Sequence, residues 1–286
     1  MLQNRATLKQ IRFHLLSELR QIYMENESDS IVRLVMKHLG YPLSVSLREP
    51  DHIPDPPVTA QINAFVADIR SGLPIQYILG QTDFCELKIK VDKRVLIPRP
   101  ETEEMVEHIK AGSRDSVQRI IDLGTGSGCI ALALKKHFTE AEVWGADQSQ
   151  EALAVAKENG IKNSLQVSWV KLDLRNPHTL EESIHFDLVV SNPPYVMESE
   201  RKMMARNVLD FEPESALFVE DKDPLIFYRA IAAFCKNYLT DRGEIWVEIN
   251  EQFGKECTNL FQKEGFSKVR VIKDIHEKDR YIYAGR

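Results

Sequence analysis

The apolar stretch that begins at Phe186 ends in Asn192, Pro193, Pro194 and Tyr195. Proline has no N–H group and restricts the residue before it, so two prolines predict a stiff, extended backbone with free carbonyl oxygens. The Asn192 side-chain oxygen adds another hydrogen-bond acceptor, and the Tyr195 ring adds an aromatic wall. A planar NH2 group has two hydrogens to donate. The segment therefore predicts a site that binds such a group, with a proline turn capped by asparagine as the purely structural alternative.

Methylation of an amide or aromatic amine is the reaction that fits such a site. The nitrogen is a poor nucleophile because its lone pair is delocalised. Acceptors that bind both of its hydrogens turn the lone pair toward a methyl donor and stabilise the positive charge that grows on nitrogen during transfer. Positioning of the nitrogen in line with the bond that breaks in the donor supplies much of the remaining rate enhancement. The product nitrogen loses its proton to water, so no general base is needed before transfer.

A second candidate site is the loop Gly124, Thr125, Gly126, Ser127 and Gly128, between a predicted strand and a predicted helix. Glycine lets the backbone turn sharply and approach a ligand closely, and doubly wound sheets bind ligands beyond the carboxyl ends of their strands. The spacing is GxGxG instead of the GxGxxG of dinucleotide sites. The loop therefore predicts a cofactor site, although a tight strand-to-helix turn would also use glycine.

Asp147 ends the next predicted strand. A carboxylate there can accept hydrogen bonds from both ribose hydroxyls of a nucleoside, and it can also cap the following helix. Loop and acid together resemble the S-adenosylmethionine site of the Rossmann-like methyltransferases. The resemblance implies that Asp122 faces the ammonium group of the cofactor, directly or through water. It also implies that Asp173 and Leu174 contact the adenine, with a plain surface role as the alternative for Asp173.

The elements that must position these residues follow two patterns. Apolar residues recur at helical spacing from Leu8 to about residue 75, which predicts a small helical bundle. The alternation in "ELKIKV", residues 86 to 91, predicts a strand of a β-hairpin, with Asp92 and Lys93 turning the chain into "RVLIP". From about Ser116, continuous apolar strands alternate with helices. This pattern predicts an α/β fold with a mostly parallel sheet, followed by an antiparallel pair near the C-terminus.

The composition argues against several classes of protein. The chain has 286 residues, a formal net charge of -6 and 43% hydrophobic residues, as expected of a globular protein. No apolar run approaches the ~20 residues of a membrane helix, and the acidic balance argues against duplex DNA as the main partner. The cysteines are scattered without CxxC pairs and the histidines do not cluster. We therefore expect reduced thiols, no metal site, no membrane partner and a cytoplasmic location.

Five stretches resemble the peptide chain release factor glutamine methyltransferases, the PrmC/HemK family. They occur in the order "PIQYILGQTDF", "VLIPRPETEEMVE", "IIDLGTGSGCIALAL", "SNPPYV" and "FEPESALF", so the resemblance covers nearly the whole chain. It implies a helical substrate-recognition domain over residues 1–80, a β-hairpin linker over 81–100 and a Rossmann-like class I methyltransferase domain over 101–286. Leu174 is a departure, because several members have an aromatic residue there.

The same resemblance implies a reaction and its participants. The methyl donor would be S-adenosyl-L-methionine, and the acceptor the glutamine amide in the Gly-Gly-Gln loop of class 1 release factors, with no nucleic acid as direct partner. Residues 124–128 and Asp147 would bind the cofactor. Asn192 would contact both cofactor and glutamine, and Pro193, Pro194 and Tyr195 would hold the glutamine.

Two motifs have a less direct interpretation. In "IPRPETE", Pro100 with Glu101 and Glu103 predicts a helix start, because acids complement the helix dipole there. Arg99 is expected to face the cofactor or the incoming peptide. The "FEPESALF" segment is expected to shape the peptide entrance.

Three other functions fit parts of the sequence. A glutamine methyltransferase of a ribosomal protein would share the Asn-Pro-Pro-Tyr segment, but "IPRPETE" favours the release-factor branch. A DNA adenine-amino methyltransferase would share it too, but would need a basic target-recognition region. A non-catalytic adaptor that binds a translation factor would not need the glycine loop, the acid and the Asn-Pro-Pro-Tyr segment together.

Overall fold

The protein is described by a computed structural model over residues 5–112, 117–176, 180–181 and 183–286. The first four residues of the predicted helical domain and the predicted start of the strand–helix alternation at Ser116 lie outside these ranges. The chain divides into two compact units. One contains the N-terminal residues to Gly80 together with Arg206–Phe211, and the other contains Gln81–Ala205 and Glu212–Arg286.

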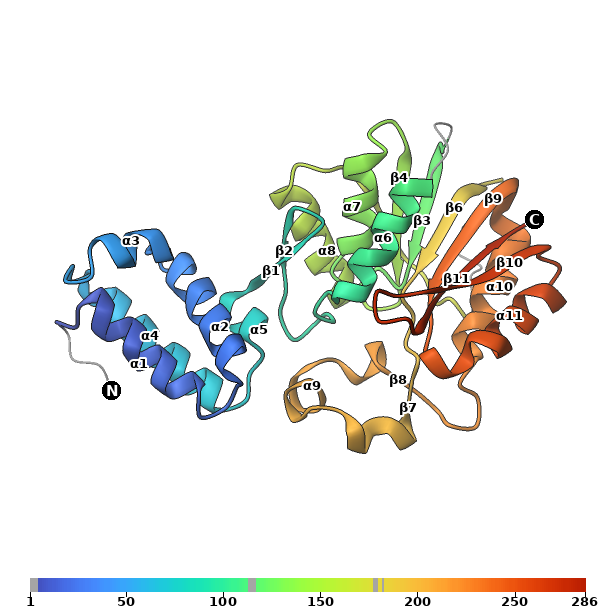
Figure 1. Ribbon diagram of the computed structural model, residues 1–286. Helices are drawn as coiled ribbons and strands as arrows, with labels where there is room; N and C mark the ends of the chain where they lie inside the picture. Colours follow the sequence, from blue (N-terminus) through green and yellow to red (C-terminus); the bar gives the residue numbers. More distant parts are fainter. Residues whose placement is uncertain (1–4, 113–116, 177–179, 182) are drawn as a thin grey trace. The chain divides into compact units, whose positions relative to one another are not determined.

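The first unit is a bundle of helices (Figure 1). The bundle consists of α1 Leu8–Leu19, α2 Glu25–His38, α3 Leu43–Arg48, α4 Pro56–Arg70 and α5 Ile75–Leu79, and the unit also includes α9 Arg206–Phe211. Thr7 begins α1 with a capping box, in which its hydroxyl accepts from the Gln10 N–H and its own N–H donates to the Gln10 side chain. Leu8, Ile11 and Leu15 are fully buried in the bundle core, as their helical spacing predicts.

The second unit begins with a β-hairpin of β1 (Gln81–Phe84) and β2 (Leu87–Lys90). The hairpin was predicted, but the chain turn at Asp92, where the Val95 N–H donates to the Asp92 carbonyl oxygen at 3.0 Å, is not the turn that joins its two strands. The chain turns at Cys85 and Glu86, which both adopt the left-handed conformation, with φ of 45° and 59°. The Cys85 N–H donates to the Glu103 carboxylate at 2.7 Å, which helps to hold this turn. "RVLIP" is not a strand.

A seven-stranded sheet forms the centre of the second unit (Figure 1). Its strands are β3 Arg119–Leu123, β4 Glu142–Asp147, β5 Ser168–Lys171, β6 Phe186–Ser191, β9 Leu239–Glu248, β10 Lys268–Lys273 and β11 Asp279–Gly285. The spatial order is β10-β11-β9-β6-β3-β4-β5. The first five of these strands in the sequence run parallel, whereas β11 pairs antiparallel with β9 and β10 with β11. The predicted α/β class and the antiparallel C-terminal pair are confirmed.

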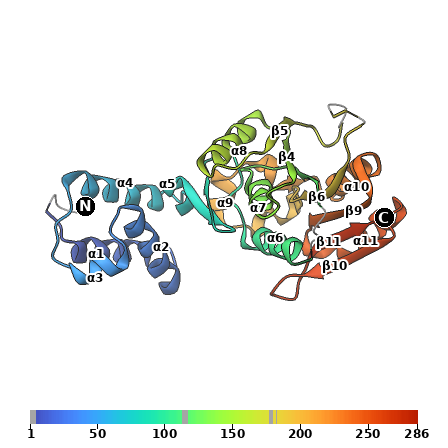
Figure 2. The same ribbon diagram turned by 90° about the horizontal axis from the view of Figure 1, so that it is seen from above.

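Helices cover both faces of this sheet, as Figure 2 shows from above. They are α6 Pro100–Gly112, α7 Cys129–His137 and α8 Gln150–Lys162 on one face, and α10 Ile226–Tyr238 and α11 Gly254–Lys263 on the other. Two short strands, β7 (Val196–Met197) and β8 (Phe218–Val219), pair in parallel outside the sheet. Among the described residues, no helix combines the length and apolar character that a membrane span requires.

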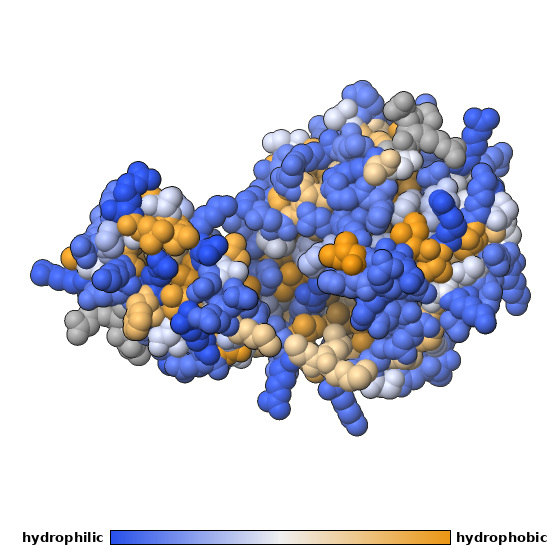
Figure 3. Space-filling view, in the orientation of Figure 1, coloured by the Kyte–Doolittle hydropathy of each residue, from blue (hydrophilic) through white to orange (hydrophobic). Residues whose placement is uncertain are grey.

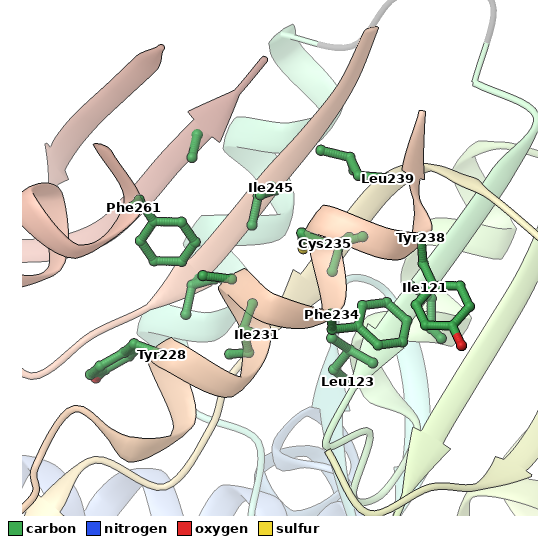
Figure 4. Packing of buried hydrophobic residues seen from close by; sticks show 14 of the residues in the cluster. Ile121, Leu123, Tyr228, Ile231, Phe234, Cys235, Tyr238, Leu239, Ile245 and Phe261 are labelled. Atoms are coloured by element: carbon green, nitrogen blue, oxygen red, sulfur yellow. The ribbon is translucent and has the colours of Figure 1, made fainter. Parts of the chain in front are cut away.

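The larger core lies between the sheet and helices α10 and α11 (Figure 4). Alternate residues of the strands point into it, such as Ile121 and Leu123 of β3 and Ile245 of β9. Phe234 of α10 and Phe261 of α11 are fully buried against them. Each such side chain stabilises the fold by about 1.5–3 kcal/mol through burial. This core fixes the strand ends at which the candidate site lies.

Candidate functional site

A cavity of about 230 Å³ lies at the carboxyl ends of the parallel strands in the second unit. Leu123, the last residue of β3, pairs with Ala146 of β4 on one side and with Ser191 of β6 on the other. The glycine loop, Asp147 and Asn192 therefore leave the sheet side by side. Residues 93–96 and 172–174 also line it, together with Pro213, Ser215 and Ala216. The register thus brings together the three motifs that the sequence singled out.

The glycine loop divides into residues that line the cavity and residues that support them. Gly124 and Gly126 line it. Gly128 does not, and it has a packing role: a Cβ there would lie 2.8 Å from the Trp169 ring and 3.0 Å from Ala156 Cβ. Its φ of +81° also favours glycine. Gly128 thus lets the start of α7 approach α8 and β5 closely.

Thr125 and Ser127 of the same loop are buried and do not line the cavity. The Ser127 carbonyl oxygen accepts a hydrogen bond from Asn159 Nδ2 at 2.9 Å. The Asn159 side chain also exchanges two hydrogen bonds with the backbone of Lys90 in β2. These contacts tie the loop to α8 and to the hairpin.

Asp147 lines the cavity where β4 ends. Its Oδ2 accepts from the Gly126 N–H at 2.9 Å and its Oδ1 from the Ser149 N–H at 2.8 Å. Ser149, not Asp147, caps α8, because the Ser149 hydroxyl accepts from the Ala152 N–H. Each carboxylate oxygen keeps a further lone pair. Asp147 can therefore hold the loop and still accept hydrogen bonds from a ligand.

Asp122 was expected to face the cofactor, but the structure does not place it on the cavity. It is fully buried, and its Oδ2 accepts from the Thr125 hydroxyl at 2.5 Å and from the Ala131 N–H at 3.3 Å. Its Oδ1 has no hydrogen-bond partner among the described residues. Burial, opposed by these hydrogen bonds, raises the pKa of Asp122 to about 7. Asp122 therefore acts on the loop through Thr125.

This raised pKa makes the stability of the protein depend on pH. The folded state favours protonated Asp122, so the stabilisation is fully present below the unfolded-state pKa, near 4, and is lost as the pH rises through about 7. Between pH 5 and pH 8, the free energy of unfolding should fall by about 2 to 3 kcal/mol more in the wild type than in Asp122→Asn. Urea unfolding of both proteins across this range measures the difference, and parallel curves would contradict the assignment.

Asp173 and Leu174 both line the cavity after β5. Leu174 also packs against the core. The Asp173 carboxylate accepts from the Arg175 N–H at 3.0 Å and from Arg175 Nε at 3.3 Å. These hydrogen bonds lower the pKa of Asp173, so it is negatively charged at neutral pH. The cavity wall here offers one apolar and one acidic side chain.

Asn192, Pro193 and Pro194 line the cavity after β6. Tyr195 does not line it, which corrects the expected aromatic wall. The Tyr195 ring packs against the core, and its hydroxyl donates to Glu248 Oε1 at 2.9 Å.

Two residues that the sequence did not single out complete this part of the site. Asn192 Nδ2 donates to Thr102 Oγ1 at 2.9 Å, and Thr102 Oγ1 donates to Glu248 Oε2 at 2.7 Å. Thr102 lies in the first turn of α6, and Glu248 is the last residue of β9. Both are buried, at 2% and 1% exposure. An acid directly after the apolar run Ile245–Val247 is the one signal that could have pointed to Glu248.

Arg99 and the "FEPESALF" segment are linked directly. Arg99 Nη2 donates to Glu212 Oε1 at 2.6 Å, and the Ile97 N–H donates to Glu212 Oε2 at 3.1 Å. Arg99 does not line the cavity, whereas Pro213, which follows Glu212, does. Arg99 thus holds a lining segment in place. The predicted helix start is confirmed, since α6 begins at Pro100.

Comparison with known proteins identifies the family of this chain. A family model described as "Methyltransferase small domain" matches residues 100–214. A release factor glutamine methyltransferase from Flavobacterium psychrophilum is 37% identical over 281 residues, covering 96% of this chain and 98% of that protein. One from Bacteroides thetaiotaomicron is 42% identical over 226 residues, covering 79% and 81%. The chain belongs to the release factor glutamine methyltransferase family. The resemblance stated from the sequence is thus confirmed.

Solved structures support the fold of this family member. A methyltransferase from Pyrococcus furiosus covers 70% of this chain and 90% of its own, with 19% identity and a TM-score of 0.53. A Thermus thermophilus 16S rRNA methyltransferase covers 72% and 49%, with 17% identity and a TM-score of 0.50. The second unit therefore has the class I methyltransferase fold.

Proposed function

We propose that the chain transfers a methyl group from S-adenosyl-L-methionine to the side-chain amide nitrogen of the glutamine in the Gly-Gly-Gln loop of class 1 peptide chain release factors. One observation carries this proposal: a single cavity joins the glycine loop and Asp147 to Asn192 and the two prolines. A methyl donor and an amide nitrogen must meet in one site. The family supplies the substrate class, and a cytoplasmic location follows from such a substrate.

The lining of the cavity suits the methyl donor. S-adenosyl-L-methionine supplies a methyl group made electrophilic by the positive charge on sulfur. Gly124 and Gly126 would let it lie against their backbone, and Asp147 would accept from the ribose hydroxyls. Leu174 would pack on the adenine, and Asp173 would accept from its amino group. The acids also favour a positively charged ligand.

The segment after β6 would hold the glutamine. The Asn192 side-chain oxygen and the backbone carbonyls at the two prolines would accept the two amide hydrogens, which turns the nitrogen lone pair toward the methyl group. The same acceptors stabilise the positive charge that develops on nitrogen. Pro193 and Pro194 keep this backbone extended, so the acceptors need little rearrangement before the reaction.

A comparison of acceptors tests the substrate. The full chain is incubated with tritium-labelled S-adenosyl-L-methionine and, separately, with a class 1 release factor, a ribosomal protein preparation and DNA. We expect label only on the release factor. Label on ribosomal protein or DNA would contradict the proposal and assign the chain to one of the alternative methyltransferases.

We further propose that residues 1–80 recognise the release factor, residues 81–100 link the two parts and residues 101–286 carry out the transfer. A Gly-Gly-Gln tripeptide offers little surface, so selection among glutamine-containing proteins needs a second contact. The bundle exposes large apolar side chains, including Phe13 at 75% and Met24 at 83%. Figure 3 shows apolar groups among hydrophilic ones on its surface. Two tethered contacts raise the effective concentration of the glutamine.

Deletion of residues 1–80 should sharply lower kcat/KM on whole release factor and leave cofactor affinity nearly unchanged. Activity on a short loop peptide should change far less, because the peptide lacks the release-factor body. Circular dichroism and calorimetry must first show that the shortened protein folds and binds cofactor, since Arg206–Phe211 loses its packing partners. Full efficiency of such a folded protein on whole release factor would contradict this role.

A further inference from the structure

Four side chains from three segments of the second unit form one continuous chain of hydrogen bonds. Asn192 donates to Thr102, and Thr102 and Tyr195 each donate to one oxygen of Glu248. Within the described residues, only Asn192 of these four lines the cavity. The other three therefore lie behind it and can act on a bound substrate only through it.

The protons in this chain have a fixed direction. Both oxygens of Glu248 accept, one from Thr102 and one from Tyr195, so Thr102 gives its single hydroxyl proton to Glu248. Thr102 then presents a lone pair to Asn192, which requires the NH2 group of Asn192 on that side. Asn192 Oδ1 consequently points away from Thr102.

The position of Glu248 is also set by the fold. Ile245 and Val247 of β9 point into the core under α10 and α11, so Glu248 lies on the opposite face, where α6 carries Thr102. Burial raises the pKa of Glu248, and the hydrogen bonds from Thr102 and Tyr195 oppose that rise. Each oxygen of Glu248 accepts one of these two hydrogen bonds. A buried acid needs such partners to be tolerated.

We propose that Glu248 is a positioning residue, which acts through Thr102 to hold the Asn192 amide with its oxygen toward the substrate nitrogen. The proposal rests on the role given to Asn192 in the proposed function. Without Glu248, the Thr102 hydroxyl could donate to the Asn192 oxygen, and the amide could turn over. Asn192 would then present its NH2 group, a donor, to the NH2 group of the substrate in place of its oxygen, an acceptor.

Thr102 offers a matched pair of variants. Thr102→Val keeps the shape of the side chain and removes the hydroxyl, whereas Thr102→Ser keeps the hydroxyl. Glu248→Gln adds a second test, because its amide group can donate to Thr102 and reverse the proton direction. Each variant is compared with the wild type in single-turnover transfer to release factor, in KM for release factor and in calorimetric binding of S-adenosylhomocysteine.

We expect Thr102→Val and Glu248→Gln to lower the transfer rate by roughly 10- to 100-fold, the scale of a misplaced reacting group. Cofactor affinity should be close to that of the wild type, and Thr102→Ser should recover most of the rate. A wild-type rate in Thr102→Val would overturn the proposal. So would a parallel loss of rate in Thr102→Ser and Thr102→Val, or a parallel loss of cofactor affinity, because either indicates packing alone.

The wild-type protein separates this proposal from the proposed function. If the wild type transfers no methyl group to release factor, the proposed function fails. If the wild type transfers it and Thr102→Val transfers it equally fast, only the role of Glu248 and Thr102 fails. Should Glu248→Gln not fold, the two Thr102 variants still decide the outcome.

Discussion

Asn192→Ala should lower the single-turnover rate of methyl transfer by roughly 100-fold or more, the scale for loss of one preorganised polar contact. Asn192 supplies an acceptor to the substrate amide, and alanine has none. The fold should survive, because Asn192 lines a cavity and, among the described residues, its side chain makes one hydrogen bond, to Thr102. Affinity for S-adenosyl-L-methionine should fall much less than the rate.

The control for this variant is Asn237→Ala, an exposed asparagine of α10. It should leave both rate and affinity unchanged. Single-turnover transfer with saturating cofactor gives the rate, and calorimetry gives the affinity. Near-normal transfer by Asn192→Ala would reject the role of this residue, and equal losses in rate and cofactor affinity would assign it to the cofactor instead.

Asp147→Ala should weaken both S-adenosyl-L-methionine and S-adenosylhomocysteine by about 1.5 to 3 kcal/mol, or roughly 10- to 150-fold in Kd. The variant removes the acceptors for the ribose hydroxyls and also the hydrogen bond that holds Gly126. The fold should persist, since Ser149 caps α8. The loss should therefore be seen in binding more than in thermal stability.

Glu142→Ala is a matched control for Asp147→Ala. Glu142 begins the strand that Asp147 ends, and its exposed carboxylate pairs with Arg119. Both variants remove one negative charge from β4, but only Asp147→Ala removes it at the cavity. Calorimetry with S-adenosylhomocysteine compares the two. Equal and small effects would mean that Asp147 has only a structural role.

Much of the fold could be predicted because the local sequence patterns match the strands and helices that the structure contains. Continuous apolar strands between helices predict a mostly parallel sheet, and such sheets bind ligands where their strands end. This reasoning placed Gly124, Asp147 and Asn192 together, and the register of β3 with β4 and β6 does bring them side by side.

The remaining features depend on contacts between distant residues or on backbone geometry without a sequence signal. The hairpin turns at Cys85 and Glu86, which lack the Asn-Gly signature of such turns. Thr102 and Glu248 are 146 positions apart and meet only because α6 packs on the sheet beside β9. The direction of Tyr195 could not be predicted either, because it depends on that same buried acid.

The position of the methyl group is the most direct test of the whole account. A purified class 1 release factor is incubated with the full chain and S-adenosyl-L-methionine, digested and analysed by mass spectrometry. We expect one added methyl group, located on the glutamine side chain of the Gly-Gly-Gln motif. It should be absent after equal time with Asn192→Ala. A methyl group on another residue, or none with a wild-type protein that is folded and binds the cofactor, would contradict the account.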